Sequence, residues 1–514
     1  MHDKICGYEL DDQQKQIVLD DSKYLLVVAG AGSGKTFTIL GKIYYFIHYL
    51  NVDPKEILCI SFTRATVTSL KEKIKKEFSF DMTVYTFHQL ALEILKQGNR
   101  CFSITASDTL ENMIHMFFSV TILEYPAFMK MVLQYFHIKK YQNILPFYQK
   151  FYQSHYHDIE MLERLILSFI HLFKCNGFVL KDFSSLLKMI KRTIFYSTYQ
   201  KEKNFLILTL NIYLQYQKYL LENQEIDFDD MVIQATSLVL EEGIPGKWKY
   251  IIIDEYQDTS LIRFQLIQAI LKQTSASLMV VGDDFQSIYR FTGCDLSLFL
   301  NFCDYFDKAN IMKIENTYRN SQELIKVAGD FVMRNKKQIH KDLRSSKRLE
   351  KPIQIIYYKD LGDTFVKLVK EIYRNSHQAI LVLGRNNKDI QMIMHDNIHI
   401  KSDGRIVLLD DVDICISYMT VHKSKGLEEE NVIVIHLENH LLGFPNQIRN
   451  DKILRLVSHS FDFYPYSEER RLFYVALTRT KNYVYLLVPR RNPSIFVLEL
   501  IKKHRKQIEV RTID

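Results

Sequence analysis

The chain has 514 residues, and at roughly 100–200 residues per domain it has room for about three or four domains. Lys and Arg number 67 against 60 Asp and Glu, and the resulting net charge of +7 permits a polyanionic partner such as nucleic acid without requiring one. The seven cysteines lack any C-x-x-C spacing, which argues against a disulfide framework and a zinc ribbon. No apolar stretch approaches 18 residues and the start does not resemble a signal peptide, so we expect a cytoplasmic protein without membrane contact.

Short β-rich runs recur along the chain and alternate with stretches of helical spacing. The first run, residues 24–29, meets a glycine-rich turn and then a helix-compatible segment, which is the order of a nucleotide-binding α/β layer. Further runs of this kind lie at 57–62, 250–255, 277–283, 379–384 and 432–437. Parallel sheets covered by helices on both faces have this pattern, so the sequence predicts an α/β fold.

Residues 91–224 differ in composition from the rest of the chain. They carry long helical patterns rich in Phe, Tyr, Leu and Ile and contain few glycines. We interpret them as a helical insertion into the first sheet domain. Most of the aromatic rings are expected to pack in a core, and a base-stacking surface on part of the insertion is the less favoured alternative.

A phosphate-binding loop is predicted at residues 29–36, AGAGSGKT. Three glycines at alternate positions allow the backbone N–H groups to face phosphate oxygens, Lys35 reaches the terminal phosphates, and Thr36 can ligate Mg²⁺. The strand before the loop and the helix after it support this interpretation. The loop residues expected to bind the nucleotide are Ala29, Gly30, Ala31, Gly32, Ser33, Gly34, Lys35 and Thr36.

The segment IIIDEYQD, residues 251–258, ends an apolar strand in two adjacent acids. A magnesium ligand followed by a water-activating base requires this arrangement, so Asp254 is a candidate metal ligand and Glu255 a candidate base. Hydrolysis also needs positive charge at the γ-phosphate in the transition state, and this charge often comes from a second domain. Arg319 and Arg479, both in the second half of the chain, are the candidates.

Ten segments taken in order resemble the complete motif series of UvrD/Rep-type superfamily 1 helicases. They are LDDQQKQIV (10–18), AGAGSGKT (29–36), SFTRAT (61–66), YTFHQL (85–90), DFDDM (227–231), IIIDEYQDTS (251–260), VVGDDFQSIYRFTGCD (280–295), NTYRNSQELI (316–325), MTVHKSKGLE (419–428) and EERRLFYVALTRTK (468–481). In wording the motifs are most similar to helicase IV-like relatives.

The resemblance implies a role for each matching position. Gln14 would read the adenine edge, Tyr318 would stack on the adenine, and Glu428 would touch the ribose. Gln286 would sense the γ-phosphate, and the two arginines would act as arginine fingers. Single-stranded DNA would cross both motor domains on hydroxyls, cations and aromatic faces, namely Phe62, Thr63, Arg64, His88, Phe291, Arg385, Thr420, His422 and Lys425.

The resemblance also implies a domain plan with two RecA-like motor domains. Motor domain 1A would comprise residues 1–90 and 225–312, the helical insertion 1B residues 91–224, and motor domain 2A residues 313–514. UvrD and Rep insert a large accessory domain, 2B, before the MTVHKSKGLE motif. Here about 388–415 is too short for one, so we expect 2B to be absent or vestigial.

The expected function is that of an ATP-dependent translocase on single-stranded or tailed duplex DNA, a helicase with 3′→5′ polarity by resemblance, using ATP and Mg²⁺. A rival interpretation is an ATP-gated DNA-end sensor or assembly subunit that licenses a partner, such as a nuclease, without processive unwinding. Unwinding of a tailed duplex distinguishes the two. The sequence does not distinguish between DNA repair, replication restart, plasmid maintenance and phage defence as the pathway.

Overall fold

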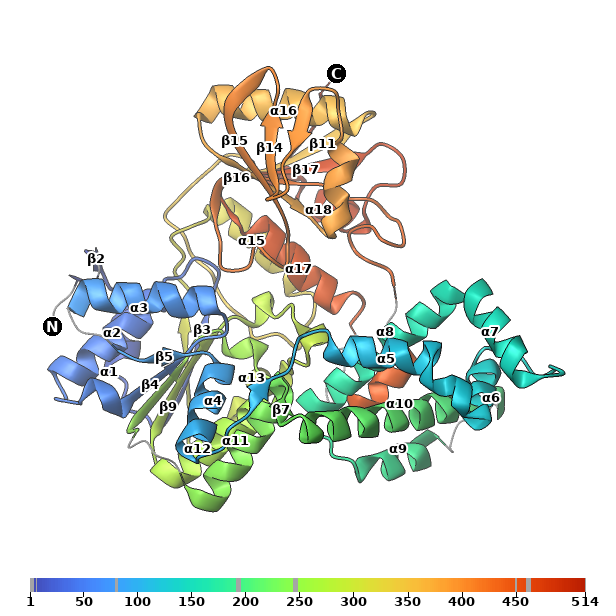
Figure 1. Ribbon diagram of the computed structural model, residues 1–514. Coiled ribbons are helices and arrows are strands. Elements are labelled where there is room, and N and C mark those ends of the chain that lie inside the picture. The colour runs from blue at the N-terminus through green and yellow to red at the C-terminus, as the bar shows by residue number, and fades with distance from the viewer. Residues whose placement is uncertain are drawn as a thin grey trace.

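The computed structural model describes residues 4–5, 7–78, 82–190, 196–243, 248–448, 451–458 and 464–513. It confirms the α/β fold, with two largely parallel sheets and a separate group of helices (Figure 1). Besides the elements bounded below, short ones are β1 (Lys4–Ile5), β2 (Tyr8–Glu9), η1 (Pro54–Glu56), η2 (Thr121–Glu124), α13 (Ser297–Leu300), α14 (Phe302–Tyr305) and η8 (Arg505–Gln507).

The first sheet is entirely parallel, and the strand before the phosphate loop is the second from one edge. In spatial order its strands are β10 (Asn310–Ile314), β3 (Tyr24–Ala29), β9 (Ser277–Gly282), β8 (Tyr250–Ile253), β4 (Ile57–Ile60) and β5 (Val84–Tyr85). Because the carboxyl ends of β3 and β8 lie at the same edge, residues that follow them share one site.

Helices cover both faces of this sheet, as the apolar run of each strand predicts. One face packs against α1 (Asp12–Leu19), α2 (Lys35–His48) and α3 (Arg64–Phe78), and the other against α4 (Phe87–Gln97), α11 (Phe228–Glu242) and α12 (Leu261–Thr274). Since α4 packs in this core, the first domain continues past the expected boundary at residue 90.

The helical insertion extends to one side of the first sheet (Figure 1). It contains α5 (Thr109–Ser119), α6 (Pro126–Tyr135), α7 (Ile144–Ser154), α8 (Tyr156–Cys175), α9 (Asp182–Ile190) and α10 (Tyr196–Glu222). A two-stranded parallel sheet, β6 (Ser103–Ile104) with β7 (Glu225–Ile226), closes its base. Most of its buried aromatic rings form one apolar core, which agrees with the favoured interpretation of its composition.

The second sheet has the spatial order β13 (Ile398–Ile400), β14 (Arg405–Leu408), β15 (Asp411–Thr420), β12 (Ile380–Gly384), β16 (Glu429–Val434), β17 (Thr480–Pro489), β11 (Ile353–Tyr358) and β18 (Ile508–Thr512). Helices α15 (Gln322–Val332), α17 (Ser467–Leu477) and α18 (Ile495–His504) pack on one face and α16 (Leu361–Ser376) on the other. In place of an accessory domain, residues 388–415 form most of η6 (Asn387–Ile393), the antiparallel strands β13 and β14, and the start of β15.

Two connections between domains differ from the predicted boundaries. The expected boundary between residues 312 and 313 falls inside β10, which pairs with β3 and so belongs to the first sheet. In addition, η7 (Lys452–Val457), which lies between β16 and α17 in the chain, packs among the insertion helices. Ile453 and Val457 are buried there, and the Asn176 amide donates to the Val457 carbonyl at 2.9 Å. A segment from the second half of the chain therefore completes the core of the insertion (Figure 1).

Candidate functional site

The predicted phosphate loop joins β3 to α2 at the carboxyl edge of the first sheet. Gly32 and Gly34 adopt φ values of 70° and 78°, a region that glycine reaches without strain, and this allows the backbone to curl above the start of α2. Ala29 and Ala31 are buried, and the buried Ser33 hydroxyl has no hydrogen-bond partner among the residues that the structure describes. The local geometry is that of an anion cradle at a helix N-terminus.

The residues expected to hold the base lie beside this loop. Asp11 caps α1, and the Gln14 side chain is fixed in the resulting capping box and donates to the Ser33 carbonyl at 3.0 Å. The Tyr318 hydroxyl donates to Asp11 at 2.7 Å, while 60% of the Tyr318 surface is exposed. The structure thus brings Gln14 and Tyr318 to the same side of the loop, with one face of the phenol ring accessible for stacking.

Lys35 and the two acids that follow β8 meet in front of the loop. The Lys35 ammonium donates to Glu255 Oε1 at 2.8 Å, and the two side chains are only 14% and 18% exposed. Burial alone would raise the pKa of Glu255, but attraction by Lys35 and Lys425 outweighs it, so that pKa is lowered. Burial and repulsion by Glu255 raise the pKa of Asp254 to about 6. Glu255 therefore stays ionised, and Asp254 is a carboxylate that an added cation would stabilise.

Both candidate finger arginines come from the second half of the chain and contact the first domain, Arg319 at the phosphate loop and Arg479 at Gln286. Arg319 lies two residues after Thr317, whose hydroxyl donates to the Ala31 carbonyl at 2.7 Å. A Cβ on Gly32 would lie 2.5 Å from the Arg319 Cβ. The Arg319 guanidinium donates to Glu428 at 2.6 Å. This close contact and the φ of 70° both explain why position 32 requires glycine.

Arg479 is buried between the domains of the first and second sheets. Its guanidinium donates to the Gln286 side-chain oxygen at 3.0 Å and to the carbonyls of Val475 and Leu427, each at 3.1 Å. Burial and the nearby positive charge of Arg319 lower the pKa of Arg479 to about 9. A buried arginine with few compensating carboxylates is poised to gain interaction energy from an anion.

The sequence analysis did not identify Lys341, a residue that stabilises the contact between Arg479 and Gln286. Lys341 is fully buried and pairs with both Asp283 and Asp284, and Asp283 in turn accepts from the Gln286 amide at 2.6 Å. The neighbouring Leu343 covers Gly30, where an added Cβ would lie 2.5 Å from a Leu343 methyl carbon. No local pattern marks a lone lysine in a connecting segment, and only the fold gives it two carboxylate partners.

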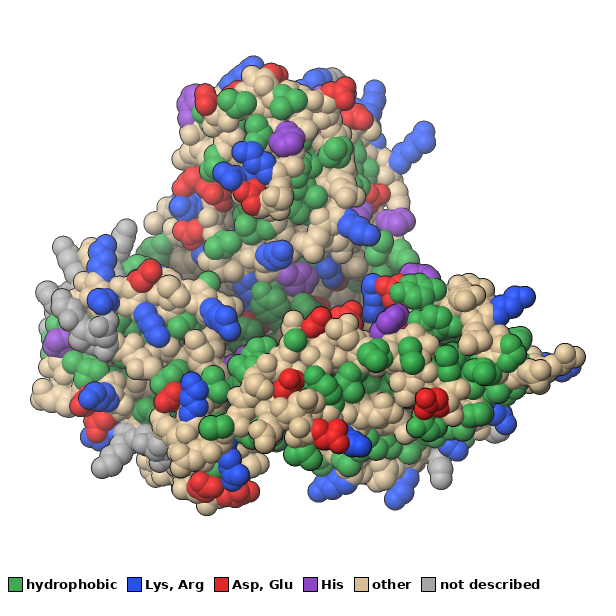
Figure 2. Space-filling view, in the orientation of Figure 1, with side chains coloured by type: hydrophobic (Ala, Val, Ile, Leu, Met, Phe, Trp, Pro, Cys, Tyr) green, Lys and Arg blue, Asp and Glu red, His purple; other side chains and the backbone are tan. Residues whose placement is uncertain are grey.

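Aromatic side chains from the domains of both sheets form a strip between them, which we define as Phe62, Tyr289, Phe291 and His422. The Phe62 and Tyr289 rings are 6.3 Å apart and nearly parallel, and the Phe291 and His422 rings are 5.6 Å apart edge to face. Phe291 is 60% exposed. Figure 2 shows a hollow where the domain of the second sheet meets the first domain and the insertion. The exposed ring of Phe291 and the half-buried rings beside it suit stacking by unpaired bases.

Other predicted DNA contacts have mixed surroundings. Thr63 and Arg64 are exposed at the start of α3. Burial and neighbouring cations lower the pKa values of His88 and His422 to about 4, so both rings are neutral at pH 7 and cannot supply charge to a phosphate. Arg385 forms a double hydrogen bond with Glu469, with its Nη2 and Nε at 2.8 and 3.0 Å from Glu469 Oε1, and Thr420 is buried.

The sequence predicts Lys425 on a DNA-binding surface, but the structure places its side chain between the two domains. Its side chain is 8% exposed, and its ammonium pairs with Asp258 and donates to the Gln286 carbonyl at 2.8 Å. Glu255 lies 3.7 Å away. Because all these partners belong to the first domain and Lys425 to the second, its charge contributes to the interdomain contact at the catalytic acids, not to an open surface.

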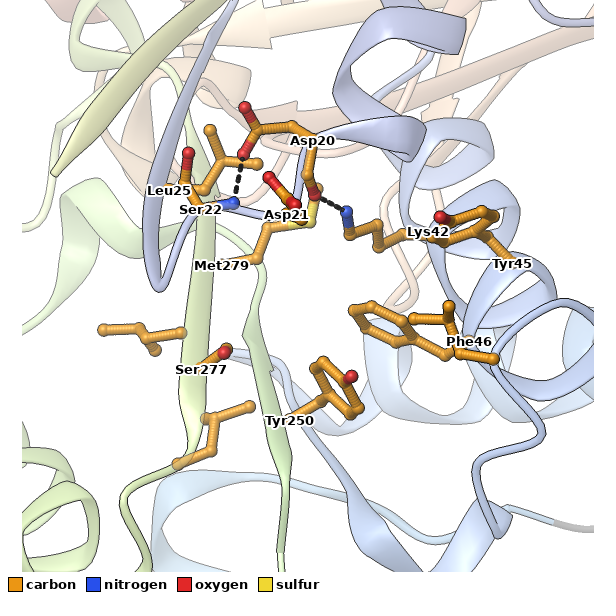
Figure 3. A pocket seen from close by; sticks show the side chains of 13 residues that line it. Asp20, Asp21, Ser22, Leu25, Lys42, Tyr45, Phe46, Tyr250, Ser277 and Met279 are labelled. Atoms are coloured by element: carbon orange, nitrogen blue, oxygen red, sulfur yellow. Dashed lines mark hydrogen bonds between the residues drawn. The ribbon is translucent and has the colours of Figure 1, made fainter.

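A small hollow lies at the opposite, amino-terminal edge of the first sheet (Figure 3). Lys42 points into it and donates to the carbonyls of Val18 at 2.9 Å and of Asp20, at the end of α1. Burial lowers the pKa of Lys42 to about 8, against the opposing attraction of Asp20 and Asp21. The lysine thereby satisfies the last carbonyls of a helix, and it stands apart from the loop chemistry.

Comparison with known proteins agrees with this geometry. Residues 10–307 match the UvrD/REP helicase N-terminal domain, and residues 408–490 match the UvrD-like helicase C-terminal domain. DNA helicase IV of Escherichia coli is 29% identical over 507 residues, covering 96% of this chain and 70% of that protein. A probable DNA helicase of Mycoplasma pneumoniae is 26% identical, covering 93% of this chain and 83% of that protein.

The ATP-dependent DNA helicase PcrA of Bacillus subtilis is 28% identical over 404 residues, and this match covers 76% of the chain but only 47% of PcrA. Among the described residues, the helices are too short or too polar to cross a membrane. The N-terminal match covers more than half of the chain and contains the phosphate loop and both acids. The protein therefore belongs to the UvrD/Rep family of ATP-dependent DNA helicases.

Proposed function

We propose that this chain hydrolyses ATP between its two motor domains to translocate along single-stranded DNA in the 3′→5′ direction and to unwind tailed duplexes. The observation that carries the proposal is the position of Arg319 and Arg479. Both belong to the second half of the chain and lie against the phosphate loop or against Gln286 of the first domain. Chemistry that needs these arginines requires closure of the two domains, and this couples hydrolysis to movement.

The donor groups at the loop fit a magnesium ion with ATP. The Thr36 hydroxyl and the Asp254 carboxylate are hard oxygen ligands, and burial and repulsion by Glu255 raise the pKa of Asp254, an effect that a bound cation would oppose. These two residues would hold the ion, which would neutralise charge on the β- and γ-phosphates. Bound phosphates would also replace Glu255 as the partner of Lys35, which frees Glu255 to accept a proton from the attacking water.

The proposed strand path follows the aromatic strip. Phe62 and Tyr289 belong to the first motor domain and His422 to the second, so a strand lying on them contacts both domains. When the domains move, one set of stacking contacts must shift against the other. Sequence-independent stacking suits a motor that must move over any base.

The proposal is tested by measuring ATP hydrolysis with and without an oligonucleotide, together with unwinding of duplexes carrying a 3′ or a 5′ tail. We expect strong stimulation by single strands and unwinding of the 3′-tailed duplex only. A Lys35→Ala variant purified in the same way measures the hydrolysis and unwinding contributed by contaminating enzymes. Equal hydrolysis in both conditions would contradict the coupling of the strand to domain closure.

The alternative of an ATP-gated subunit that licenses a partner is favoured by one feature. Exposed large apolar side chains are frequent on the insertion, among them Met116, Val120, Tyr156, Met161 and Met189, and Figure 2 shows green side chains spread over it. Such a surface suits a protein partner, for instance a nuclease. Stimulated hydrolysis without any unwinding by the purified chain, restored by a partner, would favour this alternative.

A further inference from the structure

A cluster of three different ligand types lies at the junction of the insertion with the first motor domain. His171 and Cys175 are four residues apart on α8 and so share one face, and Asp229 lies in the first turn of α11. Their ligand atoms all lie within 4.8 Å of one another. Among the described residues this is the one group of three or more His, Cys, Asp or Glu side chains with this closeness.

The spacing of these atoms is close to that around a tetrahedral ion. His171 Nδ1, the ring nitrogen that faces both other ligands, lies 3.8 Å from the Cys175 sulfur and 3.0 Å from Asp229 Oδ2, and the sulfur lies 3.3 Å from Asp229 Oδ1. With metal–ligand bonds of about 2.0–2.3 Å, tetrahedral zinc ligands are roughly 3.3–3.6 Å apart. Small side-chain rotations would therefore suffice to enclose an ion.

The two helices that carry the cluster are fixed by a buried ion-pair network. The Lys174 ammonium lies 2.8 Å from Asp230 and also pairs with Asp227. Asp227 caps α11 by accepting from the backbone N–H groups of Asp229 and Asp230. Lys174 precedes Cys175 and the two aspartates flank Asp229, so the ligands extend from a rigid support, as metal sites require.

The cluster also contacts the loop that presents Phe291. A Cβ on Gly293 would lie 2.4 Å from the Cys175 Cβ, so the loop backbone packs directly on this cysteine. The nearby Cys294 thiol donates to the Asp258 carbonyl at 2.8 Å and is not part of the ligand set. The three ligands thus lie where the insertion, the first motor domain and the Phe291 loop meet.

We propose that His171, Cys175 and Asp229 bind a borderline transition-metal ion, zinc in the first instance, with water in the fourth position. Thiolate, imidazole and carboxylate together select such an ion over magnesium. The His171 side chain is 40% exposed, which gives the ion and its water a route from solvent. The ion would tie the insertion to the motor domain beneath Phe291, a role separate from the nucleotide site.

The competing explanation is a hydrogen-bonded cluster without metal, in which the Cys175 thiol and a protonated His171 both donate to Asp229. The positive charge of Arg263 acts on both His171 and Cys175 and repels a bound cation, but it also lowers the pKa of both groups and so disfavours a protonated His171. The metal interpretation predicts a direct bond to sulfur, and the hydrogen-bonded cluster does not. A measurement of metal–sulfur bonding therefore decides between them.

The test uses the full-length chain, stripped with a chelator and titrated with Co²⁺ in excess Mg²⁺, which occupies hard oxygen sites. We expect one thiolate-to-cobalt charge-transfer band saturating at one equivalent per chain. The band should be lost in Cys175→Ser and weakened in Asp229→Asn. Cys303→Ser, which alters an exposed cysteine, and His157→Gln, which alters an exposed histidine, should retain it.

X-ray absorption of the zinc-loaded wild-type chain covers the case in which Cys175→Ser fails to fold. We expect one sulfur neighbour at about 2.3 Å and lighter neighbours at about 2.0 Å. A shell of oxygen and nitrogen only, or a cobalt band that survives in folded Cys175→Ser, would mean an adventitious ion only and would overturn the site. Zinc should also raise the thermal midpoint of the wild type but not of Cys175→Ser.

Discussion

The contact between Lys35 and Glu255 makes an unusual prediction for the variant Glu255→Gln, because it should bind nucleotide more tightly while turning it over more slowly. In the structure Glu255 Oε1 occupies Lys35 at 2.8 Å, and Glu255 Oε2 accepts from the Gln257 amide at 2.5 Å. Phosphates must displace this carboxylate to reach the ammonium. Glutamine keeps the shape of the side chain and removes its charge.

The size of the effect follows from the burial of the pair. Both side chains are less than one fifth exposed, so solvent screens their attraction only weakly. A hydrogen bond to a charged group contributes about 1.5–3 kcal/mol. At about 1.4 kcal/mol per factor of ten, removal of the competitor should tighten nucleotide binding roughly 10- to 100-fold. Loss of a general base should lower kcat by about 10²–10⁴-fold.

Titration with a fluorescent ATP analogue measures the affinity, and phosphate release with saturating single-stranded DNA measures kcat. Glu241→Gln, at an exposed position near the end of α11, provides the matched control and should change neither. Unchanged affinity in Glu255→Gln would refute the competition between Glu255 and phosphate for Lys35. Retention of most of the kcat would mean that another group activates the water.

Four further variants test other parts of the site. Arg479→Ala should lower kcat by about 10³–10⁵-fold with little change in DNA affinity, and a loss of tenfold or less in an ATPase assay would make this arginine structural. Phe291→Ala should weaken single-strand binding by about 1–3 kcal/mol for every base composition, and normal affinity by fluorescence anisotropy would remove the ring from the strand path. Because Lys425 is paired inside the protein, Lys425→Ala should lower kcat and leave the salt dependence of DNA binding unchanged. If the slope of log K against log salt concentration instead fell by about one unit, Lys425 would contact a phosphate, as the sequence predicted. Lys341→Met leaves the buried carboxylates of Asp283 and Asp284 without their cation, and urea denaturation should show an unfolding free energy lowered by about 3–5 kcal/mol. The control Lys336→Met, at an exposed position, should match the wild type.

The sequence by itself determined those features whose residues are neighbours in the chain. The phosphate loop, the Asp-Glu pair after β8 and the short parallel strands depend on local backbone requirements and on short periodic patterns. The order of the motifs was sufficient to identify the family, and the family matches confirm it. The absence of room for an accessory domain before β15 likewise followed from chain length alone.

The tertiary structure alone decided how side chains distant in the sequence pair with one another. Lys341 is 58 residues from Asp283, and Lys425 is 167 residues from Asp258, so no spacing rule relates them. A buried charge is stable only beside its partners, and which carboxylates surround it depends on how the sheets and loops meet. The same reason explains the burial of Val457 in the insertion core and the meeting of His171, Cys175 and Asp229, because each depends on packing between separate domains.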